Sequence, residues 1–132
     1  MILKPDDIRR VPWDSYDYAA FDTETTGLSP KAGDRVFGFS YTTPDRKSGY
    51  IDVREHPWAI DWLRYFFSKW RGRRVFHNQS FDHRMLAVDS IDTDLSRGWD
   101  TAVLACLVDE HEMSYSLDHL ARRYGVSQKK GQ

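Results

Sequence analysis

A short apolar run, Tyr18-Ala-Ala-Phe21, ends in two acidic side chains, and this stretch constrains the fold more than any other. The run predicts a largely buried strand, and side chains two residues apart in a strand point to the same side. Asp22 and Glu24 are therefore expected to emerge together, with Thr23 facing away. Two carboxylates on one face can hold a cation. A solvated strand end before a turn at residues 26–30 would explain the same pattern.

Composition points to one folded domain. The chain has 132 residues, 40% hydrophobic and 14% aromatic, which suffices for a single core. Its net charge of −1 supplies no long-range attraction for a polyanion, so nucleic-acid binding would depend on local basic patches or bound metal. One cysteine, Cys106, excludes an internal disulfide and a multi-thiolate metal site. No apolar run reaches membrane-span length and the first residues lack a signal-peptide layout, so a cytoplasmic protein without membrane contact is expected.

The rest of the chain predicts strands first, then helices that alternate with one more strand. Residues 1–17 are expected to be a lead-in, anchored by Trp13 and Tyr16, to a domain at 18–132. Three successive strands imply an antiparallel meander, and an aromatic stripe over 57–70 predicts a helix that caps the sheet. The result is an α/β or α+β three-layer domain with the first strand at its centre. The expected strands are 18–21, 35–43, 50–53 and 73–77, and the expected helices are 57–70, one through Met85 to Val88, 102–108 and 116–124.

A third acid, Asp82, lies in the first turn of a helix that follows a buried strand. Phe21-Asp-Thr-Glu-Thr-Thr-Gly-Leu28 resembles the first motif of the DEDD 3′–5′ exonucleases, and His77-Asn-Gln-Ser-Phe-Asp-His-Arg-Met-Leu86 resembles the second. The likeness is strongest to the proofreading domain of family A DNA polymerases. Trp99-Asp-Thr and Ser116-Leu-Asp-His-Leu-Ala121 resemble the segments that follow. The resemblance implies a ribonuclease H-like fold with a mixed five-stranded sheet and flanking helices.

It also implies hydrolysis of phosphodiesters at the 3′ end of single-stranded DNA, with release of nucleoside 5′-monophosphates. Two divalent ions supply the chemistry in such sites, and carboxylates select Mg²⁺, for which Mn²⁺ is expected to substitute. By resemblance, Asp22 bridges both ions, Glu24 binds the ion on the nucleophile side, and Asp82 holds the other. The resemblance assigns substrate contacts to Thr25, Leu28, Asn78 and Phe81.

Four further residues near the motifs have other interpretations. Leu28 as core filling remains as good an interpretation from the residues alone. Asp100 is not assigned as a fourth metal ligand, because a role as N-cap of the helix at 102–108 explains it. His77 and His83 are poorly spaced for zinc and have no thiolate partner.

The family's third motif, a Tyr or His followed by an Asp, has no counterpart after Tyr124. A site with three carboxylates predicts a weak or inactive exonuclease, which a polymerase domain or a second polypeptide would complete. A truncation, a split gene product and a degenerate remnant are all compatible with this. The alternative is a non-catalytic module that binds a single strand or docks on a polymerase. Its basic surface would comprise Arg71, Arg73, Arg74, Arg122, Arg123, Lys129 and Lys130. DNA or RNA as substrate, a Tyr or His third motif, and the oligomeric state all stay open.

Overall fold

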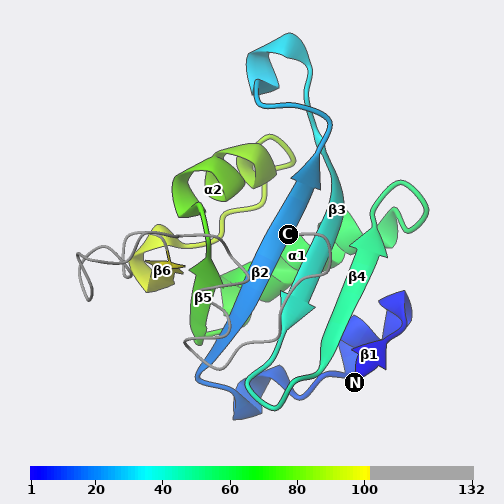
Figure 1. The fold of residues 1–132 in the computed structure, drawn as a ribbon, viewed down its shortest axis with the longest axis vertical. Coiled ribbons are helices and arrows are strands. Elements are labelled where there is room, and N and C mark those ends of the chain that lie inside the picture. The colour runs from blue at the N-terminus through cyan, green and yellow to red at the C-terminus, as the bar shows by residue number, and fades with distance from the viewer. Residues whose placement is uncertain (102–132) are drawn as a thin grey trace, which may run out of the picture.

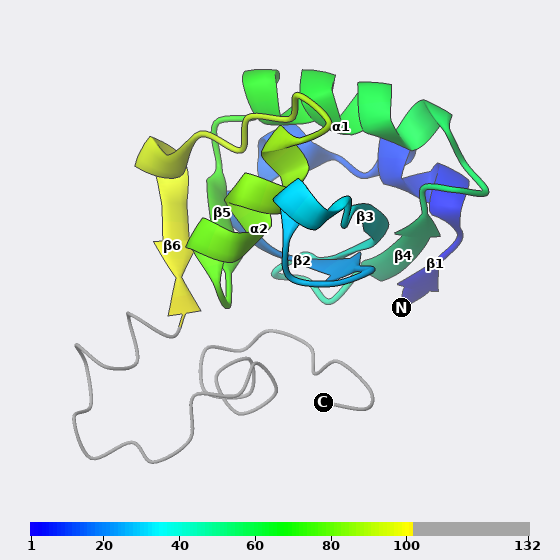
Figure 2. The same ribbon diagram turned by 90° about the horizontal axis from the view of Figure 1, so that it is seen from above.

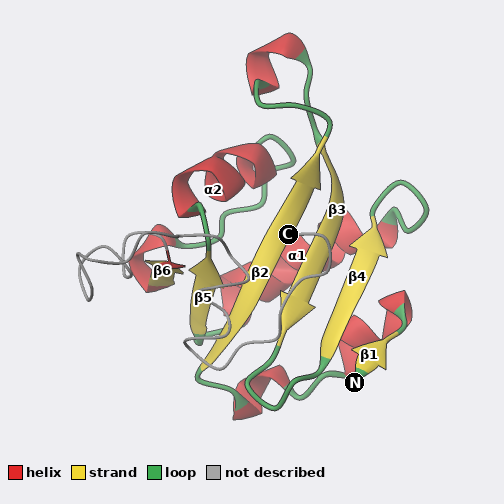
Figure 3. Cartoon of the chain, in the orientation of Figure 1, coloured by secondary structure: helices red, strands yellow, loops and turns green. Residues whose placement is uncertain are grey.

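The computed structural model describes residues 1–101, and every structural statement below concerns this part. Six strands form one mixed sheet in the order β1-β4-β3-β2-β5-β6 (Figure 1). Helix α1 covers one face of the sheet, and α2 lies beside the ends of β2 and β5 (Figures 2 and 3). The strands are β1 (Ile2–Leu3), β2 (Tyr18–Thr25), β3 (Val36–Thr42), β4 (Ser48–Asp52), β5 (Arg73–Phe76) and β6 (Gly98–Asp100), and the helices are α1 (Trp58–Lys69) and α2 (Gln79–Ala87).

Strand β2 is central, as predicted. It pairs antiparallel with β3 on one side and parallel with β5 on the other, and β3 pairs antiparallel with β4, which confirms the meander. Its side chains alternate between buried and half-buried as far as Glu24, where the register with β3 shifts. The strand runs to Thr25 and is therefore longer than the expected 18–21, because pairing with β3 continues through the acidic residues, whereas pairing with β5 covers only residues 18–20.

The α/β class and the mixed sheet are confirmed, but the expected count of five strands was too low. The edge strands β1 and β6 pair parallel with β4 and β5, and they have only two and three residues. Segments this short carry no readable alternation of apolar and polar residues. Helix α1 also begins after Pro57, which is its N-cap, and ends at Lys69 before the expected stop at Gly72. The helices expected at 102–108 and 116–124 lie outside the described residues.

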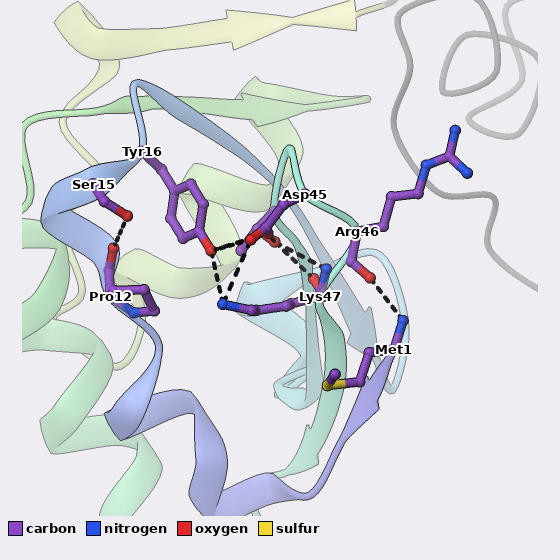
Figure 4. A network of polar contacts seen from close by, with 8 residues as sticks. Met1, Pro12, Ser15, Tyr16, Asp45, Arg46 and Lys47 are labelled. Carbon is purple, nitrogen blue, oxygen red and sulfur yellow. Dashed lines mark hydrogen bonds and ion pairs between the residues drawn. The ribbon is translucent and has the colours of Figure 1, made fainter.

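Residues 1–17 contribute to the core of the domain. Trp13 is buried among aromatic rings, its indole nitrogen donates to the Ile8 carbonyl at 2.9 Å, and its own carbonyl accepts from the Trp70 indole at 2.8 Å. The Tyr16 hydroxyl donates to the Asp45 carboxylate at 2.9 Å in the turn between β3 and β4 (Figure 4). These contacts join the start of the chain to the end of α1 and to the turn between β3 and β4.

The aromatic stripe of α1 packs into the core, as expected. Phe66 and Phe67 are buried and meet Phe21 of β2 edge-on, with ring centroids 6.0 and 5.2 Å apart. Phe21 in turn stacks on Phe39 of β3 at 5.5 Å. Helix α1 therefore holds the central strands through ring contacts, each of which adds to simple burial of apolar area.

Arg74 caps the end of α1 from inside the protein. Its side chain is 0% exposed, and its guanidinium donates to the carbonyls of Phe67 (2.9 Å), Trp70 (2.9 Å) and Gly72 (2.6 Å). Burial lowers the pKa of Arg74 to about 10, so the group stays charged at neutral pH. The positive charge lies where the helix dipole and unpaired carbonyls favour it. The prediction that Arg74 belongs to a phosphate-binding surface was wrong, because its guanidinium is buried and binds backbone carbonyls.

Replacing Arg74 with Met should lower the free energy of unfolding by about 2–4 kcal/mol, since three buried carbonyls lose a charged donor. Urea denaturation of the variant would measure this. Arg71→Met is the matched control, because Arg71 is exposed, and it should change the free energy by less than about 0.5 kcal/mol. Equal effects of the two substitutions would contradict the capping role.

Candidate active site

The two acids of the first motif lie on the half-buried row of β2. Asp22 and Glu24 alternate with Phe21 and Thr23, which point into the buried layer. Asp22 lies opposite Ser40 of β3, and Glu24 lies opposite Gly38. The register of β2 thus keeps both carboxylates out of the aromatic core and at the same end of the strand.

Asp82 belongs to α2 and contacts the buried row of β2 side chains, through Thr23. It lies in the first turn of α2, is only 3% exposed, and its Oδ1 accepts a 2.6 Å hydrogen bond from the Thr23 hydroxyl. Thr23 faces away from Asp22 and Glu24, as predicted, and in doing so contacts the third acid. The sequence reasoning missed this role of Thr23. The available signal was a hydroxyl on the otherwise apolar row Ala19, Phe21, Thr23.

The electrostatics of Asp82 are dominated by its burial. Burial raises the pKa of Asp82 to about 7, the Thr23 hydroxyl works against that rise, and the negative charges of Asp100 and Glu24 add to it. The charges of Asp100 and Glu24 act on the Asp82 carboxyl, so the three acids lie near one another. Titratable groups perturbed in this way are frequent at functional sites.

Asp100 lies at the corner where β2 and α2 meet, and it contacts the start of α2. Its Oδ2 accepts from the backbone N–H of Gln79 at 3.0 Å, so it satisfies a donor in the first turn of α2. The helix that Asp100 was expected to cap lies outside the described residues. His77 and His83 each contact a threonine hydroxyl through Nδ1, His77 with Thr101 at 3.2 Å and His83 with Thr93 at 2.8 Å.

The three predicted metal ligands do not converge into one cluster here. Among residues 1–101, no three His, Cys, Asp or Glu side chains form a group that could hold a metal ion. The structure instead brings Asp82 to Thr23 and holds Asp22 and Glu24 on the neighbouring row. The donor set still suits a hard divalent cation, because all three groups are carboxylates, and a single accepted hydrogen bond leaves Asp82 with further lone pairs.

The predicted substrate-contacting residues lie around this corner. Thr25 ends β2, and its hydroxyl donates to the Gly27 carbonyl at 2.9 Å. Asn78 is the N-cap of α2 and accepts from the backbone of Phe81, whose ring packs partly against the core. Leu28 is 78% exposed, so its interpretation as core filling was wrong. An exposed leucine next to a candidate site is available for contact with a ligand.

The described part of the predicted basic surface is small. Arg73 is exposed, and its guanidinium lies 5.3 Å from the centroid of the Trp99 ring. Arg71 is exposed as well, whereas Arg74 is buried. The remaining cations of that prediction lie beyond residue 101. Within residues 1–101, no helix is long and apolar enough to cross a membrane.

Comparison with known proteins connects these features to a family. The sequence model of a 3′–5′ exonuclease family matches residues 11–130. The DNA polymerase DpoZ of Vibrio phage phiVC8 is 44% identical over 125 residues, an alignment that covers 86% of this chain and 20% of that protein. The DNA polymerase DpoZ of Salmonella phage PMBT28 is 40% identical over 116 residues, covering 88% and 18%. The chain spans about a fifth of the length of these curated relatives.

Solved structures share the fold. Brucella melitensis NrnC with bound Mg²⁺ superposes with a TM-score of 0.65 at 20% identity, covering 92% of this chain and 60% of that one. The POL domain of Pol1 from M. smegmatis, in a complex with DNA primer-template and dNTP, gives 0.62 at 20% identity, covering 93% and 22%. The ribonuclease H-like fold implied by the motifs is thereby confirmed. Because the family model and polymerases at 40% identity or more both align with most of its length, the chain belongs to the 3′–5′ exonuclease family.

Proposed function

We propose that this chain is the exonuclease domain of a DNA polymerase and removes nucleotides from the 3′ end of a single strand by metal-assisted hydrolysis. The observation that carries the proposal is the corner where β2 and α2 meet, with Asp22 and Glu24 on one row and the buried Asp82 behind them. Polymerases that share 44% and 40% identity with the chain support the polymerase context. A polypeptide limited to these 132 residues carries the first two motifs of the family, and we expect weak or no nuclease activity from it.

Asp22, Glu24 and Asp82 are the residues that would hold the metal. Bound Mg²⁺ ions would activate the attacking water and neutralise charge on the phosphate. The bound Mg²⁺ of Brucella melitensis NrnC, which shares the fold, supports this choice of ion. The pKa of Asp82 is raised by burial and by the negative charges of Asp100 and Glu24, so a bound cation would relieve part of the cost of ionising this group.

The other residues of the corner bind and orient the strand. Thr25 and Leu28 lie where β2 leaves the sheet, and Asn78 and Phe81 lie at the start of α2. Both sets border the acids along the chain, so a strand end at Asp22 and Glu24 would contact them. Thr23 acts on Asp82 alone, because it faces the buried layer.

A non-catalytic strand-binding module is the alternative. The stack of Arg73 on Trp99 favours it, since a cation beside an exposed aromatic ring suits a nucleic-acid backbone. Salt-dependent binding of single-stranded DNA that is indifferent to metal and to Glu24→Gln would support this alternative.

Nuclease activity gives the first test. With Mn²⁺ and 3′-labelled single-stranded DNA, a polypeptide limited to residues 1–132 should release labelled nucleotide about 10²–10⁴-fold more slowly than a DEDD exonuclease with all three motifs, because the third motif supplies a group that orients the attacking water. Asp22→Ala should abolish the residual release. Robust release that Asp22→Ala abolishes would contradict the low activity while supporting the assignment. Residual release unaffected by Asp22→Ala would contradict the assignment itself.

Stability without metal gives the second test. Because the pKa of Asp82 is raised to about 7 in the folded protein, the folded state keeps a proton that the unfolded state loses above about pH 4. In EDTA, the free energy of unfolding should therefore fall by about 3 kcal/mol between pH 4 and pH 7 on account of this group. Asp82→Asn should remove that part of the decline, as measured by denaturation at several pH values. Parallel pH curves for the two proteins would contradict the buried, charge-coupled state of Asp82.

Thr23 gives the third test. Thr23→Val keeps the shape and removes the donor, so unfolding should become easier by about 1–2 kcal/mol at neutral pH, where Asp82 is partly ionised. The loss should shrink below pH 5, because a protonated Asp82 depends less on a donor. Thr23→Ser is the matched control and should behave like the parent protein. A loss that is independent of pH would assign Thr23 a packing role only.

A further inference from the structure

The face of the sheet that carries Asp22 and Glu24 also carries a tyrosine. Asp22 of β2 pairs with Ser40 of β3, and Ser40 pairs with Tyr50 of β4. These three strands lie side by side in the sheet (Figure 1). Residues that pair directly across strands have their side chains on the same face. Tyr50 therefore lies on the same face as the two acids, opposite the face that α1 covers.

Gly38 gives the Tyr50 side chain room to lie along this face. Gly38 pairs with Glu24 on one side and lies two residues from Ser40 along β3. A Cβ atom at Gly38 would lie 2.2 Å from the Tyr50 hydroxyl oxygen and 2.7 Å from Cζ. The hydroxyl is therefore placed over the residue that pairs with Glu24. Paired Cα atoms in antiparallel strands are about 4.5–5.5 Å apart, so the phenol is within reach of the Glu24 side chain.

The charges around the Tyr50 hydroxyl favour Glu24 as its acceptor. Burial raises the pKa of Tyr50, and the negative charges of Asp52 and Glu24 raise it further, so the phenol keeps its proton at neutral pH. The Asp52 carboxylate is already bound to Arg54, accepting from Nε at 3.1 Å and from Nη2 at 2.8 Å. A phenol that keeps its proton is a hydrogen-bond donor, and a carboxylate has several lone pairs to accept one.

We propose that Tyr50 is a positioning residue of the candidate site, whose hydroxyl donates to the Glu24 carboxylate and holds it in one orientation beside Asp22. The ring lies over Gly38, so the donor is fixed relative to β2. Hydrogen bonds from outside a metal site orient the carboxylates that bind the ion. The inference rests on the proposed function for a metal ion at Glu24, whereas the contact between Tyr50 and Glu24 rests on the geometry of the sheet.

A packing role for Tyr50 is the competing explanation. The ring covers Gly38, and such a role needs the ring alone and not the hydroxyl. Tyr50 is 44% exposed, so the ring buries only part of its surface. The two roles therefore differ in what the loss of the hydroxyl does.

The test compares three variants of the 132-residue chain. Y50F removes only the hydroxyl, and G38A adds a Cβ atom that displaces the hydroxyl from its place beside Glu24. Y18F is the matched control, because it removes a tyrosine hydroxyl from the same row of β2. Tyr18 lies roughly 20 Å from Glu24 along the strand, at about 3.3 Å per residue.

The first measurement is an NMR spectrum in EDTA. The two γ protons of Glu24 should have separate chemical shifts in the parent, because the carboxylate is held in one orientation. They should converge in Y50F and in G38A and stay separate in Y18F. The urea midpoint of Y50F should equal that of the parent, since the ring remains in place.

The second measurement is a Mn²⁺ titration, followed by paramagnetic broadening of the amide signals of β2. Y50F and G38A should each weaken Mn²⁺ binding about 10-fold, whereas Y18F should stay within about two-fold of the parent. D22A in the same titration tests the proposed function separately, because it removes a proposed ligand and leaves Tyr50 and Glu24 in place.

Unchanged Glu24 signals and unchanged Mn²⁺ affinity in Y50F would overturn the proposal. An effect of G38A with a silent Y50F would also overturn it, because the ring alone would then matter. Mn²⁺ binding that D22A does not weaken would reject the proposed metal site, while converged γ protons in Y50F would keep the contact between Tyr50 and Glu24. Binding that D22A weakens and Y50F does not would keep the metal site and reject the role of Tyr50.

Discussion

The two-sided character of β2 is the constraint on which the rest of the structure depends. Pairing with β3 and β5 fixes its register on both edges, so every side chain is committed to one face. Phe21 enters the aromatic layer under α1, while Asp22 and Glu24 stay on the half-buried row. A slip of one residue would exchange these rows and bury two carboxylates among aromatic rings. The core and the candidate site are therefore specified by the same strand.

The corner formed by β2 and α2 places a buried carboxyl close to other negative charges. Asp82 is buried, and its protonation reflects both that burial and the charges of Glu24 and Asp100. Several buried polar groups elsewhere in the fold are hydrogen-bonded and stabilise the surroundings of this corner. Arg74 caps α1 through three carbonyls, and Trp13 and Trp70 link the N-terminal segment to the core. An unfavourable local interaction that the surrounding structure compensates is typical of functional sites.

Local pattern in the sequence determined much of this protein. The apolar run at 18–21 with the two acids after it, the strand-like segments that follow, the aromatic stripe of α1 and the order of the motifs were enough to predict the central strand, the meander and the exonuclease family. These features depend on residues near one another in the chain, so their periodicity is visible in the sequence. The edge strands β1 and β6 were not predictable, since two or three residues have no period. Only the tertiary structure decided that Arg74 is an internal cap, that Thr23 binds Asp82 across 59 positions of sequence, and that Leu28 is exposed beside Arg84. Each of these depends on the packing of segments far apart in the chain, because burial and partner choice are set by the three-dimensional neighbourhood rather than by residue type.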